Sequence, residues 1–597
     1  MTVSTHRAST LLDAPHHDGS NVLERPDELG GEATVRLRVP RATKVDAVVL
    51  RALSDGEPRN VVAVVDEETE TETWWRASFP VRNPATRYRW LLSGGDVGYG
   101  WLNGLGLQRH DVADADDFVL SVGATAPEWH LDSVVYEIFP DRFASSGLEV
   151  ERPEWAQPKE WGTRPTGRGV ANQYDLYGGD LRGIEQRLPY LESLGVGAIY
   201  LTPFFPAVST HRYNASTFDR VDPLLGGDEA LASLLRAAHD RGIRVLGDLT
   251  TNHTGDTHEW FPERRDFYFF DDSLLHGYEA WFNVPTLPKL DWGSPALRAE
   301  MKRVARKWLD LGLDGWRIDV ANMTGRRGGD DHFAAAAATM REASAGKLLV
   351  AEHGYDWRGD VGPAGWHGAM NYSGFLRPVC GWLRRDDLSE ELRRSFWGMP
   401  VGLPELEGGR AAATMDVFRA GVAWDGVLHS WQLLDSHDTA RFRSVVGTRA
   451  RHVVGVGLQM TTPGVPMVFA GDELGLEGDW GEDARRTMPW DAEDTWDRPL
   501  LDEYRRLIAL RRSSPALARG GMRWAHVGAD ALAYLREGGG ERLLCLAARA
   551  PHEPIRLPLA ALGAQELEPV VGGDAVVTGG DAVLPGDGPA FHVWRLT

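Results

Sequence analysis

Cysteine is almost absent from this chain, and the little that is present excludes two classes of protein. The 597 residues include two cysteines, Cys380 and Cys545. They form no CxxC motif and belong to no Cys/His cluster, so neither a disulfide framework nor a zinc site is indicated. We expect both thiols to be buried and inert.

Long apolar runs are also missing, and basic charge is scarce. The first ten residues, MTVSTHRAST, lack the apolar core of a secretory signal, and no run of about 18 apolar residues occurs. Lys and Arg number 64 against 86 Asp and Glu, which gives a net charge of -22. This balance argues against nucleic acid and against an anionic membrane as partners. We therefore expect a soluble, cytoplasmic protein with a neutral ligand.

Tryptophan, in contrast, is abundant, with 23 residues. Several tryptophans stand in polar or Gly-rich surroundings, among them Trp101, Trp260, Trp292 and Trp480. A flat apolar face with a polar rim suits stacking against a sugar ring, although any single tryptophan is more often a core or interface residue.

The length allows several domains or one large barrel with attachments. Residues 1–30 are polar and predict a flexible tail. Short alternating runs separated by turn-rich joints predict an N-terminal β-sandwich over residues 31–125, of a carbohydrate-binding or dimerisation type. Similar runs with Gly-rich turns predict a second, C-terminal β-sandwich over residues 516–597.

Between the two sandwiches the pattern changes to apolar strand followed by helix, repeated. Eight strands with intervening helices predict an α/β fold, a closed (β/α)₈ TIM barrel over residues 126–515. A long interval after the third strand predicts a small inserted subdomain over residues 253–295. The strands are expected at 134–139, 198–202, 244–249, 316–320, 348–351, 369–372, 431–434 and 466–470.

One of these strands carries an unusual pair, Arg317 and Asp319. Strand alternation puts both on one face, where the guanidinium would hold the acid ionised, as a nucleophile requires. An isolated Arg-x-Asp is more often a structural ion pair. Here, however, three other strands end in acids, Asp248, Glu352 and Asp438.

Polar residues at the carboxyl ends of barrel strands form the active site in barrel enzymes. Two carboxyl groups flanking one bond are the apparatus of retaining glycoside hydrolysis. We expect Asp319 to be the nucleophile, and desolvation after the apolar run LLVA to keep Glu352 protonated as the acid. Asp438 would stabilise the positive transition state. The same strand ends carry Asn252, His253, His353 and His437.

These segments resemble the four short blocks of the α-amylase family, glycoside hydrolase family 13: GDLTTNH at 247–253, GWRIDVAN at 315–322, VAEH at 350–353 and LDSHD at 434–438. Four supporting blocks are VYEIFPDRF at 135–143, GGDL at 178–181, HRYN at 211–214 and GVPMVFAGDE at 464–473. The resemblance spans roughly residues 133–515.

The resemblance implies a role for each matching position. Asp319 would be the nucleophile, Glu352 the acid and base, and Asp438 the transition-state stabiliser. The remaining positions would contact or support the sugar in the cleavage subsite: His253, Arg317, His437 and His353 as contacts, Tyr213 stacked on the ring, and Asp248 and Asn252 behind them. After the eighth strand, Asp483 and Arg485 either bind the terminal sugar or form an exposed loop ion pair.

Within the family, the N-terminal sandwich, DVAN at 319–322 and LPKLD at 287–291 are similar to the cyclomaltodextrinase, neopullulanase and maltogenic amylase group. That group dimerises through its N-terminal domain, so a homodimer is implied. The chain departs from the group at Asp291, Met323 and the pair His353-Gly354, so the resemblance does not fix the substrate on the leaving-group side. ASSGLEV at 144–150 replaces the calcium loop of some members, so calcium is not supported and no cofactor or metal is expected.

The function expected from the sequence is retaining hydrolysis of α-1,4-glucosidic bonds in short or cyclic maltooligosaccharides, including a cyclic maltosyl-maltose. An α-glucanotransferase or α-glucosidase of the same family is the nearest alternative. A catalytically inactive carbohydrate-binding protein is an alternative of another class, and the presence of all three carboxylates opposes it.

Overall fold

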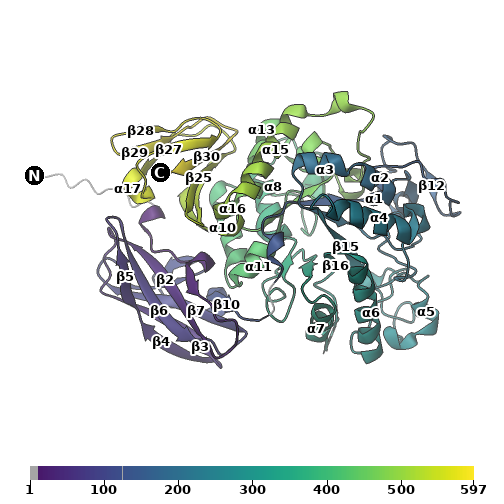
Figure 1. Ribbon diagram of the computed structural model, residues 1–597, viewed down its shortest axis with the longest axis horizontal. Coiled ribbons are helices and arrows are strands. Elements are labelled where there is room, and N and C mark those ends of the chain that lie inside the picture. The colour runs from purple at the N-terminus through teal and green to yellow at the C-terminus, as the bar shows by residue number, and fades with distance from the viewer. Residues whose placement is uncertain (1–10, 124–125) are drawn as a thin grey trace, which may run out of the picture.

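The computed structural model describes residues 11–123 and 126–597, and at its centre eight parallel strands form a closed barrel (Figure 1). Their order is β20-β19-β16-β15-β14-β11-β22-β21, and a parallel bridge between Met370 and Trp431 joins the two ends. The strands are almost wholly buried and rich in Val, Ile and Leu, as a parallel sheet covered on both faces requires. The predicted fold class is confirmed. The strands are β11 (Val135–Ile138), β14 (Ala198–Leu201), β15 (Arg244–Thr250), β16 (Gly315–Asp319), β19 (Leu348–Ala351), β20 (Gly368–Ala369), β21 (Trp431–Leu433) and β22 (Val465–Phe469).

Helices surround this barrel, and local signals fix their ends. In the helix Pro295–Leu311, Ser294 caps the Leu297 N–H, a proline occupies the first position and Gly312 follows the last turn. The helices are α1 (Pro140–Phe143), α2 (Leu181–Gln186), α3 (Leu188–Leu194), α4 (Gly227–His239), α5 (Trp260–Glu263), α6 (Pro295–Leu311), α7 (Phe333–Ala343), α8 (Arg377–Leu383), α9 (Glu390–Arg394), α10 (Gly408–Arg419), α11 (Trp424–His429), α12 (Phe442–Val446), α13 (Arg449–Thr461), α14 (Gly481–Ala484), α15 (Arg498–Ser513) and α16 (Pro515–Arg519).

The segment predicted as an insertion lies between β15 and α6. It consists of α5, short 3-10 turns and isolated antiparallel bridges, of which His253 to Lys289 and Tyr268 to Leu290 tie its two ends together. These bridges bring Lys289 next to the carboxyl end of β15.

The N-terminal sandwich packs a sheet of order β1-β2-β6-β5 against one of order β4-β3-β7-β8-β9, with β10 paired to β7. Val35, Leu37 and Trp90 belong to the core between them and are fully buried. The strands are β1 (Val22–Glu24), β2 (Glu32–Pro40), β3 (Ala47–Ser54), β4 (Glu57–Val62), β5 (Val64–Glu68), β6 (Glu72–Pro80), β7 (Ala85–Gly94), β8 (Gly98–Asn103), β9 (Gly106–Gln108) and β10 (Phe118–Ser121).

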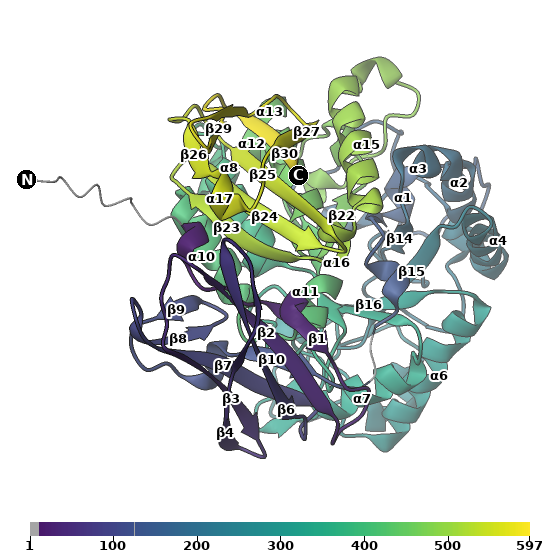
Figure 2. The same cartoon turned by 60° about the vertical axis from the view of Figure 1, so that its left-hand side comes forward.

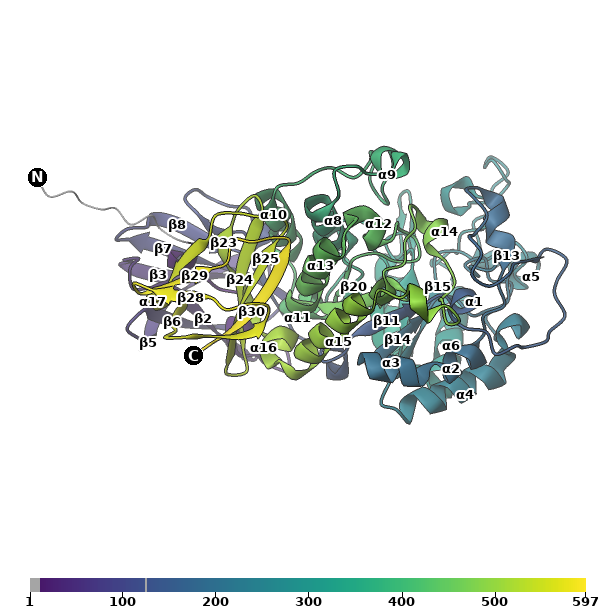
Figure 3. The ribbon, with the colours of Figure 1, turned by 90° about the horizontal axis from the view of Figure 1, so that it is seen from above.

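The C-terminal sandwich has sheets of order β23-β24-β25-β30-β27 and β26-β29-β28. It lies beside the N-terminal sandwich, and both pack against the same side of the helix-covered barrel (Figures 2 and 3). Its elements are β23 (Gly521–Val527), β24 (Ala531–Gly538), β25 (Glu541–Ala548), β26 (Ile555–Pro558), α17 (Leu559–Leu562), β27 (Leu567–Val571), β28 (Val576–Thr578), β29 (Asp581–Leu584) and β30 (Ala590–Leu596).

The N-terminal segment differs from the flexible tail expected over residues 1–30. Residues 1–10 lie outside the described residues. From Leu11 onward the segment is structured: Leu12 is buried in the core of the C-terminal sandwich, and β1 pairs with β2. An Asp18 carboxylate oxygen accepts the Met522 N–H at 2.9 Å. These contacts join residues distant in sequence, so no local pattern reveals them.

Two smaller expectations concern the cysteines and the membrane. Cys380 and Cys545 are free and buried, as predicted, and burial raises the pKa of Cys545 to about 12, so its thiol stays protonated. Within residues 11–123 and 126–597, every helix is too short or too polar to span a bilayer.

Candidate active site

Four acidic side chains meet at the carboxyl edge of the barrel. Asp319 is the last residue of β16, Glu352 follows β19 directly, Asp248 lies in β15, and Asp438 is in the loop after β21. Since β15, β16 and β19 are adjacent parallel strands, their carboxyl ends open to one mouth. The sequence prediction that these acids converge agrees with this arrangement.

One guanidinium, that of Arg317, connects three of the acids. Its Nη1 donates to Asp319 Oδ1 at 2.8 Å and to Asp248 Oδ2 at 3.1 Å, and Nη2 forms an ion pair with Glu352 Oε1 at 3.1 Å. Arg317 is fully buried. Burial lowers its pKa, but the carboxylates Asp248 and Glu352 outweigh this effect and raise the pKa well above its ordinary value. From sequence, Arg317 was expected to serve Asp319; its contact with Glu352 arises because β16 and β19 are neighbours.

The residue after Asp319 holds the backbone in an unusual conformation. Val320 has φ of 45°, a region that β-branched residues avoid. In this conformation the Val320 N–H donates to Glu352 Oε2 at 2.7 Å. Glu352 is thus held from two sides, by the guanidinium and by a strained peptide of the neighbouring strand.

The pKa values of the acids are pushed in opposite directions. Burial raises the pKa of Asp319 well above its ordinary value, the nearby Glu352 carboxylate raises it further, and Arg317 opposes both. Burial also raises the pKa of Asp438, but the cations His437 and Arg485 outweigh it and leave the pKa lowered. Asp438 is therefore ionised, whereas burial and the neighbouring carboxylate disfavour the charge on Asp319.

Asp319 Oδ2 and His253 Nε2 are among the buried polar atoms of this cluster without a hydrogen-bond partner, and they lie 4.0 Å apart. Burial, followed by the Lys289 charge, lowers the pKa of His253 to about 3, so the ring is neutral. Its Nδ1 lies 3.3 Å from the Asn252 amide nitrogen, which assigns the ring proton to Nε2. A free carboxylate oxygen and a free N–H side by side mark where polar atoms of a ligand bind.

On the opposite side, His437 connects the remaining residues. Its Nε2 lies 2.8 Å from the Tyr213 hydroxyl and 3.3 Å from Asp438 Oδ2, and the Tyr213 ring stacks on the imidazole. Its Nδ1 lies 2.5 Å from Glu137 Oε1. Burial lowers the pKa of His437, but Asp438 and Glu137 outweigh it and raise the pKa above its ordinary value, which favours the cationic ring.

Sequence reasoning missed Glu137 and Tyr200 as supporting residues. Glu137 is fully buried within β11, and Tyr200 of β14 donates its hydroxyl to Asp248 at 2.5 Å. An acid in the middle of an apolar strand was the available signal for Glu137, because such an acid is seldom buried without a partner. Nothing comparable distinguishes Tyr200 from an ordinary core tyrosine.

Two residues expected to bind sugar are engaged elsewhere. His353 has Nε2 at 3.2 Å from Asp360, and its Nδ1 accepts the Tyr355 N–H. Asp483 is 2% exposed, and both its carboxylate oxygens accept from Arg164 and Arg486.

The loop ion pair between Asp483 and Arg485, one of the two alternatives considered from sequence, is not formed, because Asp483 pairs with Arg164 and Arg486. Arg485 instead donates to Asp438 Oδ1 at 2.9 Å and to the His437 carbonyl. It joins the carboxylate cluster through Asp438, while Asp483 anchors the loop behind it.

Asn252 faces a cation supplied by the chain itself. The Lys289 ammonium donates to Asn252 Oδ1 at 2.5 Å and to the Met323 carbonyl at 3.0 Å. These oxygens therefore face an ammonium, and residues 11–123 and 126–597 contain no group of three or more His, Cys, Asp or Glu side chains placed to hold a metal. The donor set at Asn252 does not fit a calcium ion.

A cavity of 170 Å³ opens beside Asp438. Trp397 and Trp480 line it, and Trp397 is stacked on Tyr372 with ring centroids 4.0 Å apart. Flat aromatic walls next to ionised carboxylates are the surroundings in which sugar rings bind.

Comparison with known proteins agrees with this geometry. Residues 137–524 match the model of the alpha amylase catalytic domain. The chain is 30% identical to neopullulanase 2 of Thermoactinomyces vulgaris over 88% of each chain, and 30% identical to a cyclomaltodextrinase of Thermoanaerobacter pseudethanolicus over 70% of each.

Solved structures resemble it as well. A cyclomaltodextrinase superposes with a TM-score of 0.73 at 24% identity, covering 98% of this chain and all of that one. The cyclic α-maltosyl-(1→6)-maltose hydrolase of Arthrobacter globiformis superposes with a TM-score of 0.65 at 28% identity, over 79% of this chain and all of that one. The chain belongs to the α-amylase family of glycoside hydrolases.

Proposed function

We propose that the protein hydrolyses α-1,4-glucosidic bonds of short or cyclic maltooligosaccharides with retention of configuration. The observation that carries the proposal is the unpartnered Asp319 Oδ2, held beside Glu352 by one shared guanidinium. A nucleophile needs a free lone pair, and an acid needs to stand within reach of the same bond.

In the first step Asp319 attacks the anomeric carbon while Glu352 protonates the departing glycosidic oxygen. This step requires an ionised Asp319, and the 2.8 Å contact with Arg317 favours that form. In the second step Glu352 takes a proton from water, whose oxygen attacks the anomeric carbon and releases Asp319. Two inversions give net retention.

The other residues hold the sugar and its charge. Asp438, kept ionised by His437 and Arg485, stabilises the oxocarbenium-like transition state. The His253 N–H donates to a sugar hydroxyl, His437 holds Asp438 and Tyr213 in position, and the Tyr213 ring packs against the pyranose. Asp248 and Asn252 orient Arg317 and His253 from behind.

Confinement of the site favours small substrates. Asp319 is 5% exposed and Glu352 9% exposed, and the cavity beside Asp438 is small. The similarity to a cyclic α-maltosyl-(1→6)-maltose hydrolase makes a cyclic, α-1,6-containing tetrasaccharide a second substrate to test.

Activated substrates separate the two carboxyl roles. Fluoride leaves without protonation, so Glu352→Gln should still release a first equivalent of fluoride from α-maltosyl fluoride, seen as a burst before the slow second step, while losing about 10³-fold or more on maltotriose. Asp319→Asn should lose both, because no nucleophile remains. Equal losses of the two variants on both substrates would contradict the assignment, and so would a first product of β configuration.

Transfer to a second sugar is the nearest alternative reaction, because an acceptor hydroxyl can replace water in the second step. Products from concentrated maltotriose discriminate the two. Glucose and maltose as main products support hydrolysis, whereas longer oligosaccharides as main products would assign a glucanotransferase.

We also propose an intracellular homodimer without a cofactor. An intracellular maltogenic amylase of Bacillus subtilis is 31% identical over 69% of this chain, and the Asn252 oxygen already faces Lys289. Light scattering should give twice the chain mass, and a chelator should leave activity unchanged. A monomeric mass, or activity lost with chelator and restored by calcium, would overturn the respective part.

A further inference from the structure

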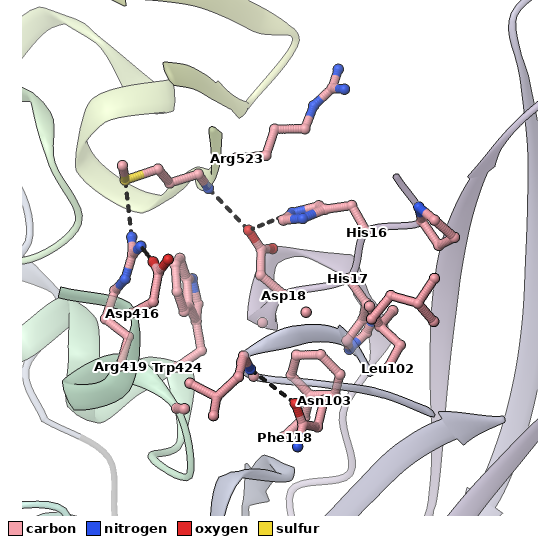
Figure 4. A pocket seen from close by; sticks show the side chains of 18 of the residues that line it. His16, His17, Asp18, Leu102, Asn103, Phe118, Asp416, Arg419, Trp424 and Arg523 are labelled. Carbon is pink, nitrogen blue, oxygen red and sulfur yellow. Dashed lines mark hydrogen bonds and ion pairs between the residues drawn. The ribbon is translucent and has the colours of Figure 1, made fainter. Parts of the chain in front are cut away.

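A second cavity lies away from the carboxylate cluster. It measures 520 Å³ and opens where both sandwiches meet α10 and α11 (Figure 4). Its walls come from residues 11–19, from the turn between β8 and β9, from the end of α10 and from Met522 to Trp524. Asp319, Glu352 and Asp438 do not line this cavity, so it is separate from the carboxylate cluster.

Aromatic rings form much of the wall. Trp424 at the start of α11, Trp524 of β23, and Tyr88 and Phe118 of the N-terminal sandwich all line the cavity. Rings from three parts of the molecule thus offer apolar faces around one space, as in pockets that bind the C–H faces of sugars.

A carboxylate and a guanidinium stand among these rings. Asp416 accepts from the Trp524 indole N–H at 3.0 Å and from Arg419. Another Arg419 nitrogen reaches the Met522 sulfur at 2.9 Å, which is a weak acceptor, and the Arg419 side chain remains 20% exposed (Figure 4). The pair therefore has acceptor and donor capacity left for hydroxyl groups.

A third polar group, the side chain of Asn103, lies on the wall formed by the turn between β8 and β9. Asn103 accepts the Leu105 N–H through its side-chain oxygen at 3.0 Å. Its amide nitrogen has no hydrogen-bond partner within residues 11–123 and 126–597, although the residue is only 3% exposed. Donors and an acceptor thus surround a cavity with apolar walls.

The charges in the wall indicate a neutral ligand. Each arginine that lines the cavity has its own carboxylate partner: Arg38 pairs with Glu72, Arg419 with Asp416, and Arg523 with Glu537. No guanidinium remains uncompensated for a phosphate or carboxylate. A volume of 520 Å³ lies within the range of small-molecule sites and suits a sugar of about two or three rings.

We propose that this cavity is an accessory, non-catalytic site for a short α-glucan, at the junction of the barrel and the two sandwiches. The chemical class follows from the rings, the paired charges and the free hydrogen-bonding groups. That the sugar is an α-glucan rests on the proposed function.

Calorimetric titration with maltotriose tests the proposal in the non-hydrolysing Asp319→Asn chain. We expect one binding event that Leu105→Trp removes, in addition to any event at the carboxylate cluster. Leu105 lines the cavity at its turn side and is 38% exposed, so a larger side chain should block the cavity without disturbing a core. Leu29→Trp, at a leucine outside the cavity that is 50% exposed, is the matched control and should leave every event in place.

A second variant, Arg419→Gln, should weaken the same event about fivefold or more by removing a charged donor. A titration that Leu105→Trp and Arg419→Gln leave unchanged would overturn the accessory site and leave the proposed reaction intact. Conversely, the α-maltosyl fluoride experiment could contradict the proposed roles of the carboxyl groups while the binding event that Leu105→Trp removes is still observed. The proposed reaction would then be wrong and the accessory site would stand.

Discussion

At the residue scale, the site depends on how one buried guanidinium is shared. Arg317 contacts Asp248, Asp319 and Glu352, so three negative groups have one cation between them. Burial and the neighbouring carboxylate raise the pKa of Asp319, and Arg317 opposes them. The roles proposed for Asp319 and Glu352 therefore depend on a cation that both carboxyl groups share.

Val320 provides a test of the strain beside this pair. Its φ of 45° is unfavourable for a β-branched residue and tolerated by asparagine, so Val320→Asn should raise the free energy of unfolding by about 1 kcal/mol in denaturant titrations. Val320→Thr keeps the branch and the strain and should give no gain. A lower stability for the asparagine variant than for the threonine variant would show that the backbone is not strained here.

His437 gives a pH dependence with a definite sign. Its folded-state pKa lies above 6.5, so the stability it contributes is complete below pH 6.5 and is lost as pH rises through the raised pKa. The gap in unfolding free energy between the parent chain and His437→Gln should therefore narrow from pH 6 to pH 9. His253→Gln is the control, because a pKa of about 3 leaves that ring neutral from pH 7 upward, and its gap should stay constant between pH 7 and pH 9.

The residue types at the site were predictable from sequence, and several of their partners were not. The Arg317 and Asp319 pair follows from strand alternation, and the acids at strand ends follow from the barrel pattern. The positive φ of Val320 and the pairing of Asp483 with Arg164 depend on loop geometry and on residues distant in the chain. Local patterns carry no information about either.

At the scale of elements, the barrel strands were predictable because each is a short apolar run between helical repeats. Seven of the eight observed strands have both ends within two residues of the expected ones. β20, expected over 369–372, covers Gly368–Ala369, since the chain turns there into a π-helical segment at Tyr372–Leu376. The structured segment from Leu11 to Glu24 was missed, because Leu12 and Asp18 contact residues of the C-terminal sandwich, which are distant in sequence.

Gly247 shows how closely two of these strands pack. A Cβ at this position of β15 would lie 2.5 Å from the Trp316 ring of β16 and 3.0 Å from Phe204. Gly247→Ala should therefore lower the free energy of unfolding by about 1–3 kcal/mol, measured by denaturant titration. Gly573→Ala, where a Cβ would meet open space, should change it by less than about 0.5 kcal/mol. Similar values for the two variants would contradict the packing.

At the scale of the whole molecule, the segment around Leu12 links parts that are far apart in sequence. Leu12 is 1% exposed in the core of the C-terminal sandwich, while β1, ten residues later, belongs to the N-terminal sandwich. The hydrogen bond that the Met522 N–H donates to the Asp18 carboxylate adds a polar connection. The segment from Leu12 to β1 thus joins the two sandwiches directly, in addition to their contacts with the barrel.

Truncation of Leu12 measures this connection. Leu12→Ala should lower the free energy of unfolding by about 2–4 kcal/mol, because a buried leucine leaves a cavity when it is shortened. Leu11→Ala is the matched control, since Leu11 is 50% exposed and its loss should cost less than about 0.5 kcal/mol. Equal effects in the two chains would mean that the segment does not support the sandwich core.

The closure of the barrel between β20 and β21 has a further consequence. β20 has two residues and β21 three, and one bridge, Met370 to Trp431, joins them. Few backbone hydrogen bonds hold this junction, so we expect the amide protons of β20 and β21 to exchange with solvent sooner than those of the other barrel strands. The loop that carries Asp438 follows β21, whereas Asp319 lies on β16, which is paired with β15 and β19. We therefore expect Asp438 to adjust to the shape of an incoming sugar more readily than Asp319 does.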